Sequence, residues 1–472
     1  MSSSLPLPCT GLGIATENVS DNIDKRGTLV ATILGSSLAF IVGSIINVAL
    51  PQMQADFEVG PTGAQWIVNA YLLPLGAFVL IGGALGDHYG RKRVFQLGLG
   101  VFAIACMLCA VAWSFPVLLA GRVLEGIGAA MIAPTSLAII ADGFSGKERG
   151  QAVGTWAAAG AAAGAVAPLA GGVIVDLAGW RWAFVAVFPI SLYAMLVAHR
   201  SVRESLASKN QTAPLDWLGA ALSCAGLFAL IWGLIAAPER GMTTGVIAAL
   251  GFGITALLTF LKVEADKGDR AMTPLALFAN ATFSGLSVLT FCLYAALGGL
   301  MVLLPYVLIE DLGYSATAAG AAILPFPLIL GLLSRSVGGV MTERFGTKAL
   351  LVLGSLLVGA GFLLFAQVPA DTVSYWRDIL PALVILALGM AASVAPLTTA
   401  VLESAGDRYS GVASGINNAI SRIAGLIATA LLGLVLIAYA DNLAVGFALS
   451  AWVGVALACL SAVTIFFSMD RG

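Results

Sequence analysis

Two ionisable residues stand in the middle of a long apolar run. Arg122 and Glu125 lie three positions apart, so a helix would place both on one face. A charged side chain in hydrocarbon costs about 2.5–3.5 kcal/mol, which makes such a residue a candidate for transport or proton transfer. The pair predicts proton coupling, with Glu125 taking up and releasing a proton while Arg122 tunes the pKa of Glu125 or binds an anionic group. The alternative is a structural pair in which Glu125 only neutralises Arg122.

A glycine-rich hairpin carries the second group of charges. Residues 83–91 read GALGDHYGR, and a weaker copy, GVMTERFGTK, recurs at 339–348. Glycine allows a tight turn and a close approach of helices. The acid in each copy stands at a helix end, where it can meet an arginine or a helix N-terminus. The recurrence indicates two related halves, as in a duplicated transporter.

A third segment consists almost entirely of small residues. Positions 157–167 are alanine or glycine apart from one valine, and Pro168 follows them. Small side chains let helix backbones approach closely, and proline removes a backbone hydrogen bond and permits a kink. The segment therefore predicts a tightly packed helix.

Further polar and aromatic residues stand inside apolar runs or at their ends and are candidates to line a substrate cavity. They are Asn47, Gln65, Asn69, Tyr71, Tyr294, Asn417 and Asn418. The alternatives are interfacial aromatic anchors and hydrogen bonds between helices. Two other arginines in apolar runs, Arg335 and Arg422, are expected to pair with acids of nearby loops.

The composition indicates that membrane helices position these residues. Of 472 residues, 59% are hydrophobic and 10% are charged, whereas an ordinary soluble domain has about 25% charged residues. The 23 Lys and Arg against 25 Asp and Glu leave no basic excess for binding nucleic acid. The six Cys and two His show no metal-ligand spacing, so we expect no metal and no cofactor.

Fourteen apolar stretches are each long enough to cross a hydrocarbon core of ~30 Å as a helix. Residues 1–27 are polar and lack the apolar region of a secretory signal peptide, so we expect a flexible tail. The predicted spans are 28–50, 65–86, 94–113, 115–140, 150–173, 182–199, 217–236, 244–262, 280–309, 316–340, 348–367, 378–400, 411–438 and 443–467.

The positions of Lys and Arg predict the orientation. The tail, the C-terminus and the loops on their side of these spans hold seventeen of them, and loops on the other side hold three. Positive residues accumulate in cytoplasmic loops, so we expect both termini in the cytoplasm. The loops are short and the chain has no Gly-x-x-x-x-Gly-Lys-Ser/Thr motif. An ATPase is excluded, and any pumping needs an ion gradient or a partner.

The ordered set of motifs resembles the fourteen-span drug:proton antiporter family of the major facilitator superfamily. The matching segments are 47–51, 65–71, 83–91, 122–128, 154–172, 179–184, 216–219 and 411–418. The resemblance implies an all-α membrane protein of major facilitator fold with 14 transmembrane helices. Two six-helix bundles, 28–199 and 280–472, would rock around a central cavity. A cytoplasmic linker and the inserted helices 7 and 8 would occupy 200–279.

The resemblance also implies roles for two groups of residues. The gating loop, whose aspartate would hold the bundles together on the cytoplasmic side, would contain Gly83, Asp87, Gly90 and Arg91. The antiporter motif, which marks exporters, is matched by Gly154, Pro168 and Gly171.

Two positions depart from the family pattern. Glu125 stands where relatives have an amide, and Val42 stands where relatives commonly have an acid in span 1. That acid is associated with proton coupling or cationic drugs. We therefore expect neutral, anionic or lipid-like substrates to be favoured over organic cations, with Glu125 as a replacement site for the proton.

We predict a secondary active transporter, not an enzyme, which exports small amphipathic or hydrophobic compounds by proton-coupled alternating access. The alternative is a dedicated carrier, for export or uptake, of a single metabolite, lipid or siderophore. A membrane enzyme would need a catalytic constellation, and a channel would need rings of like charge or a carbonyl filter. The sequence offers neither. We expect a monomer in the bacterial inner membrane, with its substrate, protons and lipid as partners.

Overall fold

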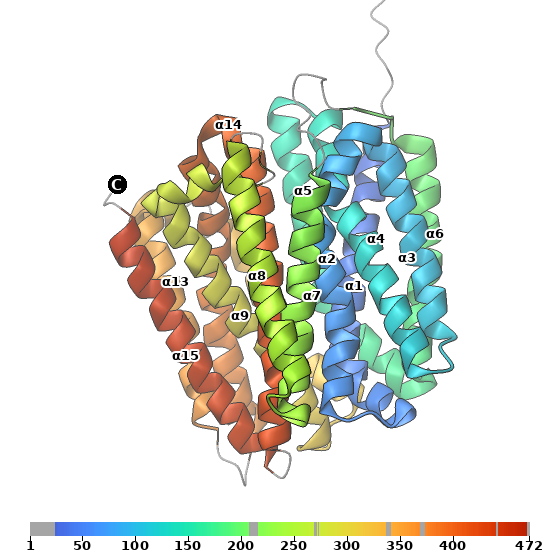
Figure 1. The fold of residues 1–472 in the computed structure, drawn as a ribbon, viewed down its shortest axis with the longest axis vertical. Coiled ribbons are helices and arrows are strands. Elements are labelled where there is room, and N and C mark those ends of the chain that lie inside the picture. The colour runs from blue at the N-terminus through green and yellow to red at the C-terminus, as the bar shows by residue number, and fades with distance from the viewer. Residues whose placement is uncertain are drawn as a thin grey trace, which may run out of the picture.

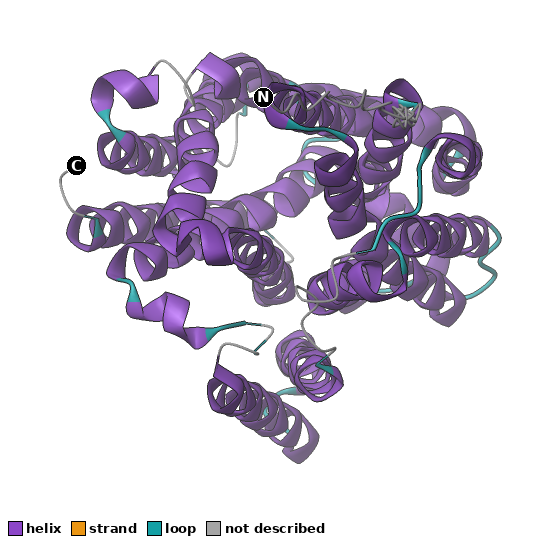
Figure 2. Cartoon of the chain, turned by 90° about the horizontal axis from the view of Figure 1, so that it is seen from above, coloured by secondary structure: helices purple, strands orange, loops and turns teal. Residues whose placement is uncertain are grey.

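The computed structural model describes residues 24–206, 216–268, 271, 273–336, 341–368, 373–439 and 442–469. Within these residues the chain is almost entirely helical and has no strand, and Figure 2 shows most of the helices nearly end-on. The tail predicted at 1–27 lies outside the described residues apart from 24–27. The central part of the predicted linker, 207–215, lies outside them as well.

The helices follow one another with short connections. The first six are α1 (Lys25–Phe57), α2 (Pro61–Tyr89), α3 (Arg91–Ala110), α4 (Phe115–Gly143), α5 (Gly146–Ala178) and α6 (Trp180–Ser201). Two more, α7 (Trp217–Arg240) and α8 (Thr244–Lys267), precede a short 3₁₀ helix at Leu275–Ala279. The remainder are α9 (Ala281–Glu310), α10 (Ala316–Ile323), α11 (Pro325–Ser336), α12 (Thr342–Phe345), α13 (Thr347–Ala366), a π-helical turn at Tyr375–Ile379, α14 (Leu380–Ala438) and α15 (Leu443–Ser468).

The described residues contain fourteen helical segments that are long and apolar enough to cross a membrane, which confirms the predicted number. In two places the spans and the helices do not correspond one to one. The span predicted at 316–340 is made by α10 and α11 together, and α14 contains two spans that meet at Gly406. Gly406 has φ 68°, a left-handed conformation that breaks the helix and is easiest for glycine.

Several helices are longer than the predicted spans. The first was predicted to end at residue 50, but α1 continues through Pro51 to Phe57. Asp24 caps its first turn, because the Asp24 carboxylate accepts a hydrogen bond from the Gly27 amide at 2.9 Å. Hydrogen bonds from the Ser201 hydroxyl and from Gly27 lower the pKa of Asp24. The length of an apolar run predicts only the part of a helix that lies within hydrocarbon. The capped ends extend beyond it and were therefore not predicted.

The helices form two halves with separate apolar cores. Figure 1 shows α1 to α6 on one side and α9, α13, α14 and α15 on the other. One core is built mainly from α1, α2, α3, α4 and α6, and the other from α9, α10, α13, α14 and α15. The inserted pair α7 and α8 lies in front of the seam in Figure 1, where Ile231 and Ile235 of α7 pack on Leu426 and Ala430 of α14.

The bundle has two ends, the tail end and the far end. The tail end carries the start of α1, the α2–α3 hairpin and the end of α15, and lies at the top of Figure 1. The far end carries the α1–α2 and α5–α6 connections. Lys25 and Glu148 form an ion pair of 2.6 Å at the tail end, and Arg181 and Asp56 form one of 2.7 Å at the far end.

Candidate substrate cavity and proton site

Arg122 and Glu125 form an ion pair inside the first half. The Arg122 Nη1 donates to Glu125 Oε2 at 2.6 Å, and their side chains are 1% and 0% exposed. Arg122 Nε donates to the Ile67 carbonyl at 3.1 Å, and the Cys106 thiol donates to the other Glu125 oxygen at 3.3 Å. The Arg122 guanidinium also lies 4.6 Å from the centre of the Tyr71 ring. The pair predicted from the spacing is therefore formed, and both carboxylate oxygens have a partner.

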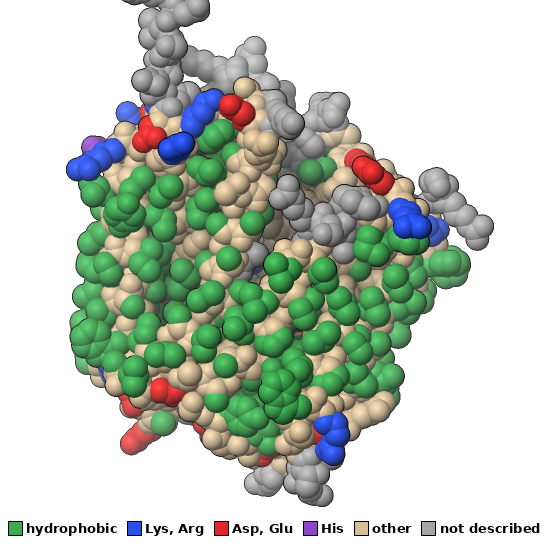
Figure 3. All heavy atoms as spheres, turned by 180° about the vertical axis from the view of Figure 1, so that it is seen from behind, with side chains coloured by type: hydrophobic (Ala, Val, Ile, Leu, Met, Phe, Trp, Pro, Cys, Tyr) green, Lys and Arg blue, Asp and Glu red, His purple; other side chains and the backbone are tan. Residues whose placement is uncertain are grey.

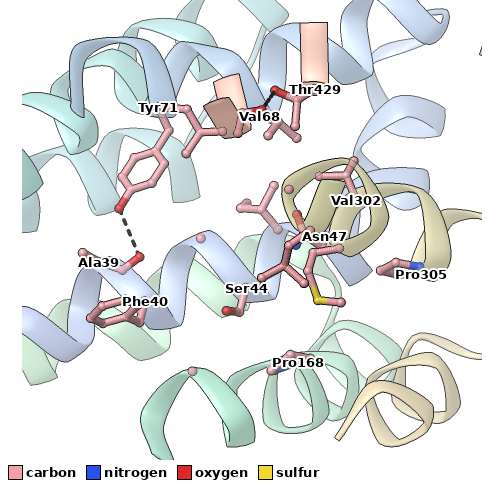
Figure 4. A pocket seen from close by; sticks show the side chains of 18 of the residues that line it. Ala39, Phe40, Ser44, Asn47, Val68, Tyr71, Pro168, Val302, Pro305 and Thr429 are labelled. Carbon is pink, nitrogen blue, oxygen red and sulfur yellow. Dashed lines mark hydrogen bonds between the residues drawn. The ribbon is translucent and has the colours of Figure 1, made fainter. Parts of the chain in front are cut away.

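A cavity of about 370 Å³ lies between the two halves. Helices α1, α2, α4 and α5 line it from the first half, and α9, α11, the end of α10 and the second part of α14 line it from the other. Figure 4 shows Phe40, Ser44 and Asn47 along α1, with Tyr71 and Pro168 on opposite sides. The walls are mostly apolar with a few polar groups, which is typical of a small-molecule site.

Arg122, but not Glu125, is part of this cavity wall. Arg122 therefore lies between the buried carboxylate and the cavity. Tyr71 helps to fix this arrangement, because its hydroxyl donates to the Ala39 carbonyl at 3.0 Å (Figure 4) while its ring contacts Arg122. Val42, which replaces the acid of relatives, is buried and is not among the lining residues.

Arg422 is a second arginine in the cavity wall, and the expectation stated for it above was wrong. It was predicted to pair with a loop acid, but among the described residues it has neither an ion pair nor a hydrogen bond. Its guanidinium lies 5.9 Å from the centre of the Phe40 ring across the cavity. The only sequence feature that indicated a cavity position for Arg422 was its place inside an apolar run. The side chain of Arg335 lies outside the described set.

The predicted cavity residues fall into three groups. Asn47, Tyr71 and Tyr294 line the cavity. Gln65 and Asn69 instead join the halves: Gln65 Nε2 donates to the Thr429 and Ala430 carbonyls at 3.1 and 2.7 Å, and Asn69 Oδ1 accepts from the Thr429 hydroxyl at 2.6 Å.

The third group is not in the cavity wall, which differs from the prediction. Asn417 accepts a hydrogen bond of 2.6 Å from the Thr290 hydroxyl, so its side chain joins α14 to α9. Asn418 is exposed and donates to the Ser414 carbonyl of its own helix at 3.3 Å.

The sequence profile of the Major Facilitator Superfamily matches residues 32–429 and, in a second match, 286–471. The chain belongs to the major facilitator superfamily.

Similar proteins refine this assignment. The methylenomycin A resistance protein of Bacillus subtilis (strain 168) is 31% identical over 413 residues, which are 86% of this chain and 87% of that protein. The multidrug resistance protein Stp of Mycobacterium tuberculosis (strain CDC 1551 / Oshkosh) is 31% identical over 417 residues, 87% of this chain and 76% of that protein. A solved POT family transporter in complex with a thioalcohol-conjugated peptide has a TM-score of 0.72 at 13% identity, over 94% of this chain and 97% of that one.

These findings confirm the predicted fold and class. The POT family transporter shows the fold alone, because so few residues are identical. The resistance proteins place this major facilitator among transporters of the drug-antiporter type, and such proteins are not enzymes.

The predicted gating loop of this major facilitator is a network within the first half. Arg91 donates to Asp87 Oδ1 from Nε at 3.0 Å and from Nη2 at 2.9 Å, and it also pairs with Asp142 of α4. Gly90 has φ 108° at the turn between α2 and α3, where the Glu204 carboxylate accepts from the first amides of α3. Gly83 packs near Pro134, where an added Cβ would lie 3.4 Å from the proline Cβ.

The predicted antiporter motif lies on α5, but its three residues have different surroundings. A Cβ on Gly171 would come within 2.6 Å of the Ile45 side chain, so glycine permits the crossing of α5 and α1. Pro168 lines the cavity, and its carbonyl oxygen lies against Gly320 of α10. Gly154 has no neighbour within 4 Å of an added Cβ, so tight packing, which the small residues predicted, does not explain it.

One far-end contact was not predicted from the sequence. Asp176, near the end of α5, accepts hydrogen bonds from the Ala316 amide at 3.1 Å and the Thr317 amide at 2.8 Å. These are the first amides of α10, so the carboxylate of one half caps a helix of the other. With the bonds of Gln65 and Asn69, this contact joins the two halves at the far end. In Figure 3 the visible surface is hollowed between the halves toward the tail end, beside residues drawn in grey.

Proposed function

We propose that this major facilitator is a proton-coupled exporter of small amphipathic or hydrophobic compounds. The observation that carries the proposal is the Arg122–Glu125 ion pair. The Glu125 carboxylate is fully buried, and its partner Arg122 lines the cavity. An ionisable group at such a depth is a candidate for ion coupling. The resistance proteins named above support export as the direction.

The geometry suggests how a proton and a substrate exclude each other. When Glu125 is ionised, it neutralises Arg122 at 2.6 Å. When Glu125 is protonated, Arg122 keeps an uncompensated charge at the cavity wall, which only a water-filled cavity can solvate. An apolar substrate that displaces this water therefore favours ionised Glu125 and release of the proton. Mutual exclusion of this kind is what antiport requires.

The proposal includes the orientation and the gates. The tail end faces the cytoplasm, and the protein functions as a monomer in the bacterial inner membrane. In the present conformation Asp87 is bound to Arg91 of its own half. When the tail end closes, Asp87 and Arg91 meet the other half, and the far-end contacts of Asp176 open. Residues 28–199 and 280–472 then move as two bundles.

The decisive experiment compares Glu125→Gln with wild type in proteoliposomes and in an efflux-deficient bacterial host. We expect Glu125→Gln, which mimics the protonated carboxyl, to bind an apolar substrate more weakly and to lose acceleration of transport by a pH gradient, because the amide cannot take up the proton. Glu264→Gln is the matched control. Glu264 is also fully buried, but it lies on α8 outside the cavity and bonds to Thr273.

Each outcome of this comparison has a clear meaning. Full pH-gradient acceleration in Glu125→Gln, with the variant folded, would reject Glu125 as the coupling group. Loss of acceleration in both variants would indicate a general effect of losing a buried acid. A panel of dissimilar compounds in the bacterial host separates a multidrug exporter from the dedicated carrier, since protection against a single compound alone would favour the latter.

A further inference from the structure

The charges that line the cavity are unbalanced. Two arginines, Arg122 and Arg422, contribute to its wall, and no aspartate or glutamate is among the lining residues of the described chain. The charge of Arg122 is compensated by Glu125 immediately behind it. Arg422 has no such partner within the described residues, although it is half-buried. The cavity therefore presents one uncompensated positive charge.

The position of Arg422 is set by helix packing and not by ion pairing. A Cβ added to Gly76 of α2 would lie 3.6 Å from the Arg422 Cβ, so the two helices are in contact at this point. From there the side chain extends toward Phe40 of α1, and Tyr294 of α9 lines the same space. Because an uncompensated charge in a membrane is costly, its retention in a cavity points to a ligand that compensates it.

We propose that Arg422 binds the acidic group of amphipathic organic anions, such as aryl or alkyl carboxylates, and so sets the substrate class of the exporter. This rests on the proposed function, because it assumes that the cavity holds the transported compound. A guanidinium offers two parallel N–H donors to a carboxylate and forms its strongest pairs in a dry site. The apolar body of the substrate would lie against Phe40, Leu297, Met301 and Phe326, which line the same cavity.

The alternatives fit the cavity less well. An organic cation would meet Arg422 without an acid among the described wall residues to hold it, and Val42 occupies the position where relatives commonly carry that acid. A neutral compound would leave the charge of Arg422 unpaired while removing its water, which is unfavourable. An anion is the ligand that satisfies the guanidinium and fills the apolar space at once.

The test measures equilibrium binding with three probes that share one apolar body. These are 4-(1-naphthyl)butanoate, 4-(1-naphthyl)butanol and 4-(1-naphthyl)butylamine, titrated calorimetrically into the full chain in nanodiscs, with empty nanodiscs subtracted. We expect wild type to bind the butanoate about tenfold or more tightly than the other two. Arg422→Gln should weaken butanoate binding by about 10- to 100-fold, as for loss of a charged hydrogen-bonded pair, and should strengthen butanol binding, because no charge is then left unpaired.

Two further variants complete the design. Arg240→Gln is the matched control, since it removes the same charge from an exposed site at the end of α7, and it should bind like wild type. Arg422→Lys keeps the charge without the two-pronged geometry and should retain part of the preference for butanoate. If Arg422→Gln does not elute as a folded monodisperse species, wild type and Arg422→Lys together decide the question.

Three results would overturn the proposal: equal binding of butanoate and butanol by wild type, an unchanged preference in folded Arg422→Gln, or no binding of any probe to folded wild type. The assay contains no gradient. The pH-gradient experiment on Glu125→Gln therefore tests the proposed function, and the binding experiment tests the anion site, so either can fail without the other.

Discussion

The contact between Asp176 and α10 predicts a measurable shift in the conformation of the transporter. Asp176→Asn keeps the shape of the side chain but removes its charge, and its amide group can no longer accept from both Ala316 and Thr317. Asp176 is exposed, so the loss should be that of a helix cap and its dipole interaction, about 1 kcal/mol. Because the contact joins the two halves, this energy is lost only from the conformation with a closed far end. The ratio of open to closed far ends should rise about fivefold.

Distances between spin labels at the far end measure this ratio directly. Trp113 follows α3 and Trp376 precedes α14, and they are 75% and 76% exposed, so cysteines placed there carry labels without disturbing a core. Cys9, the half-buried Cys224 and the exposed Cys459 are replaced by serine to leave one labelled pair. Double electron–electron resonance in nanodiscs should show the longer-distance population increase in Asp176→Asn.

Asp56→Asn provides the control that separates a gate from a general effect of charge. Asp56 also lies at the far end and also binds two donors, Trp180 Nε1 at 2.8 Å and Arg181 Nη1 at 2.7 Å. All three residues belong to the first half, so their bonds are present whether the far end is open or closed. An unchanged distance distribution in Asp176→Asn, or an equal change in Asp56→Asn, would refute the assignment of Asp176 to the gate.

Three other expectations follow from local contacts. Gly126→Val should abolish the folded, monodisperse protein in size-exclusion chromatography, because an added Cβ would clash with the Tyr71 carbonyl, whereas Gly154→Ala should elute like wild type. Asp216→Ala should lower the free energy of unfolding by about 1–2 kcal/mol in denaturant titrations, since Asp216 caps α7 and pairs with Lys267. Burial raises the pKa of Asp216, but hydrogen bonds lower it by more, so this stability should be present above pH 3.8 and lost as the pH falls below it. An inside-negative potential without a pH gradient should accelerate export of the naphthylbutanoate probe more than that of the butanol, because each butanoate cycle moves one more charge, as flux from proteoliposomes would show.

Features that depend on position along one helix were predictable from the sequence. The number of spans follows from apolar length, and the pairing of Arg122 with Glu125 follows from a spacing of three. The sharp turn at Gly90 likewise follows from local chemistry. Each of these needs only the helix itself and the thickness of the membrane.

Features that depend on which face of a helix meets which neighbour were not predictable. Helix faces toward lipid and toward protein are both apolar, so the sequence shows little of the periodicity that reveals the buried face in a soluble protein. For that reason Asn417 and Asn418 were placed in the cavity, and Arg422 was assigned to a loop acid. No sequence feature marked Asp176, because its partners are backbone amides of a helix 140 residues away.

The expected response to membrane potential follows from the charges around the cavity. With Glu125 ionised and an organic anion on Arg422, the two arginines and two anions sum to zero, so the loaded transporter moves no net charge. Once the anion has left, the same groups carry one positive charge, and two if Glu125 is protonated. The returning transporter is thus drawn toward a negative interior by about 2.3 kcal/mol per charge per 100 mV. A neutral substrate leaves the same charge on Arg422 in both directions, so in the absence of proton coupling the potential does no net work on it. In this arrangement the apolar body of the substrate displaces water from Arg122 and so determines when Glu125 releases its proton. The acidic group, by neutralising Arg422, determines how much electrical work the membrane contributes.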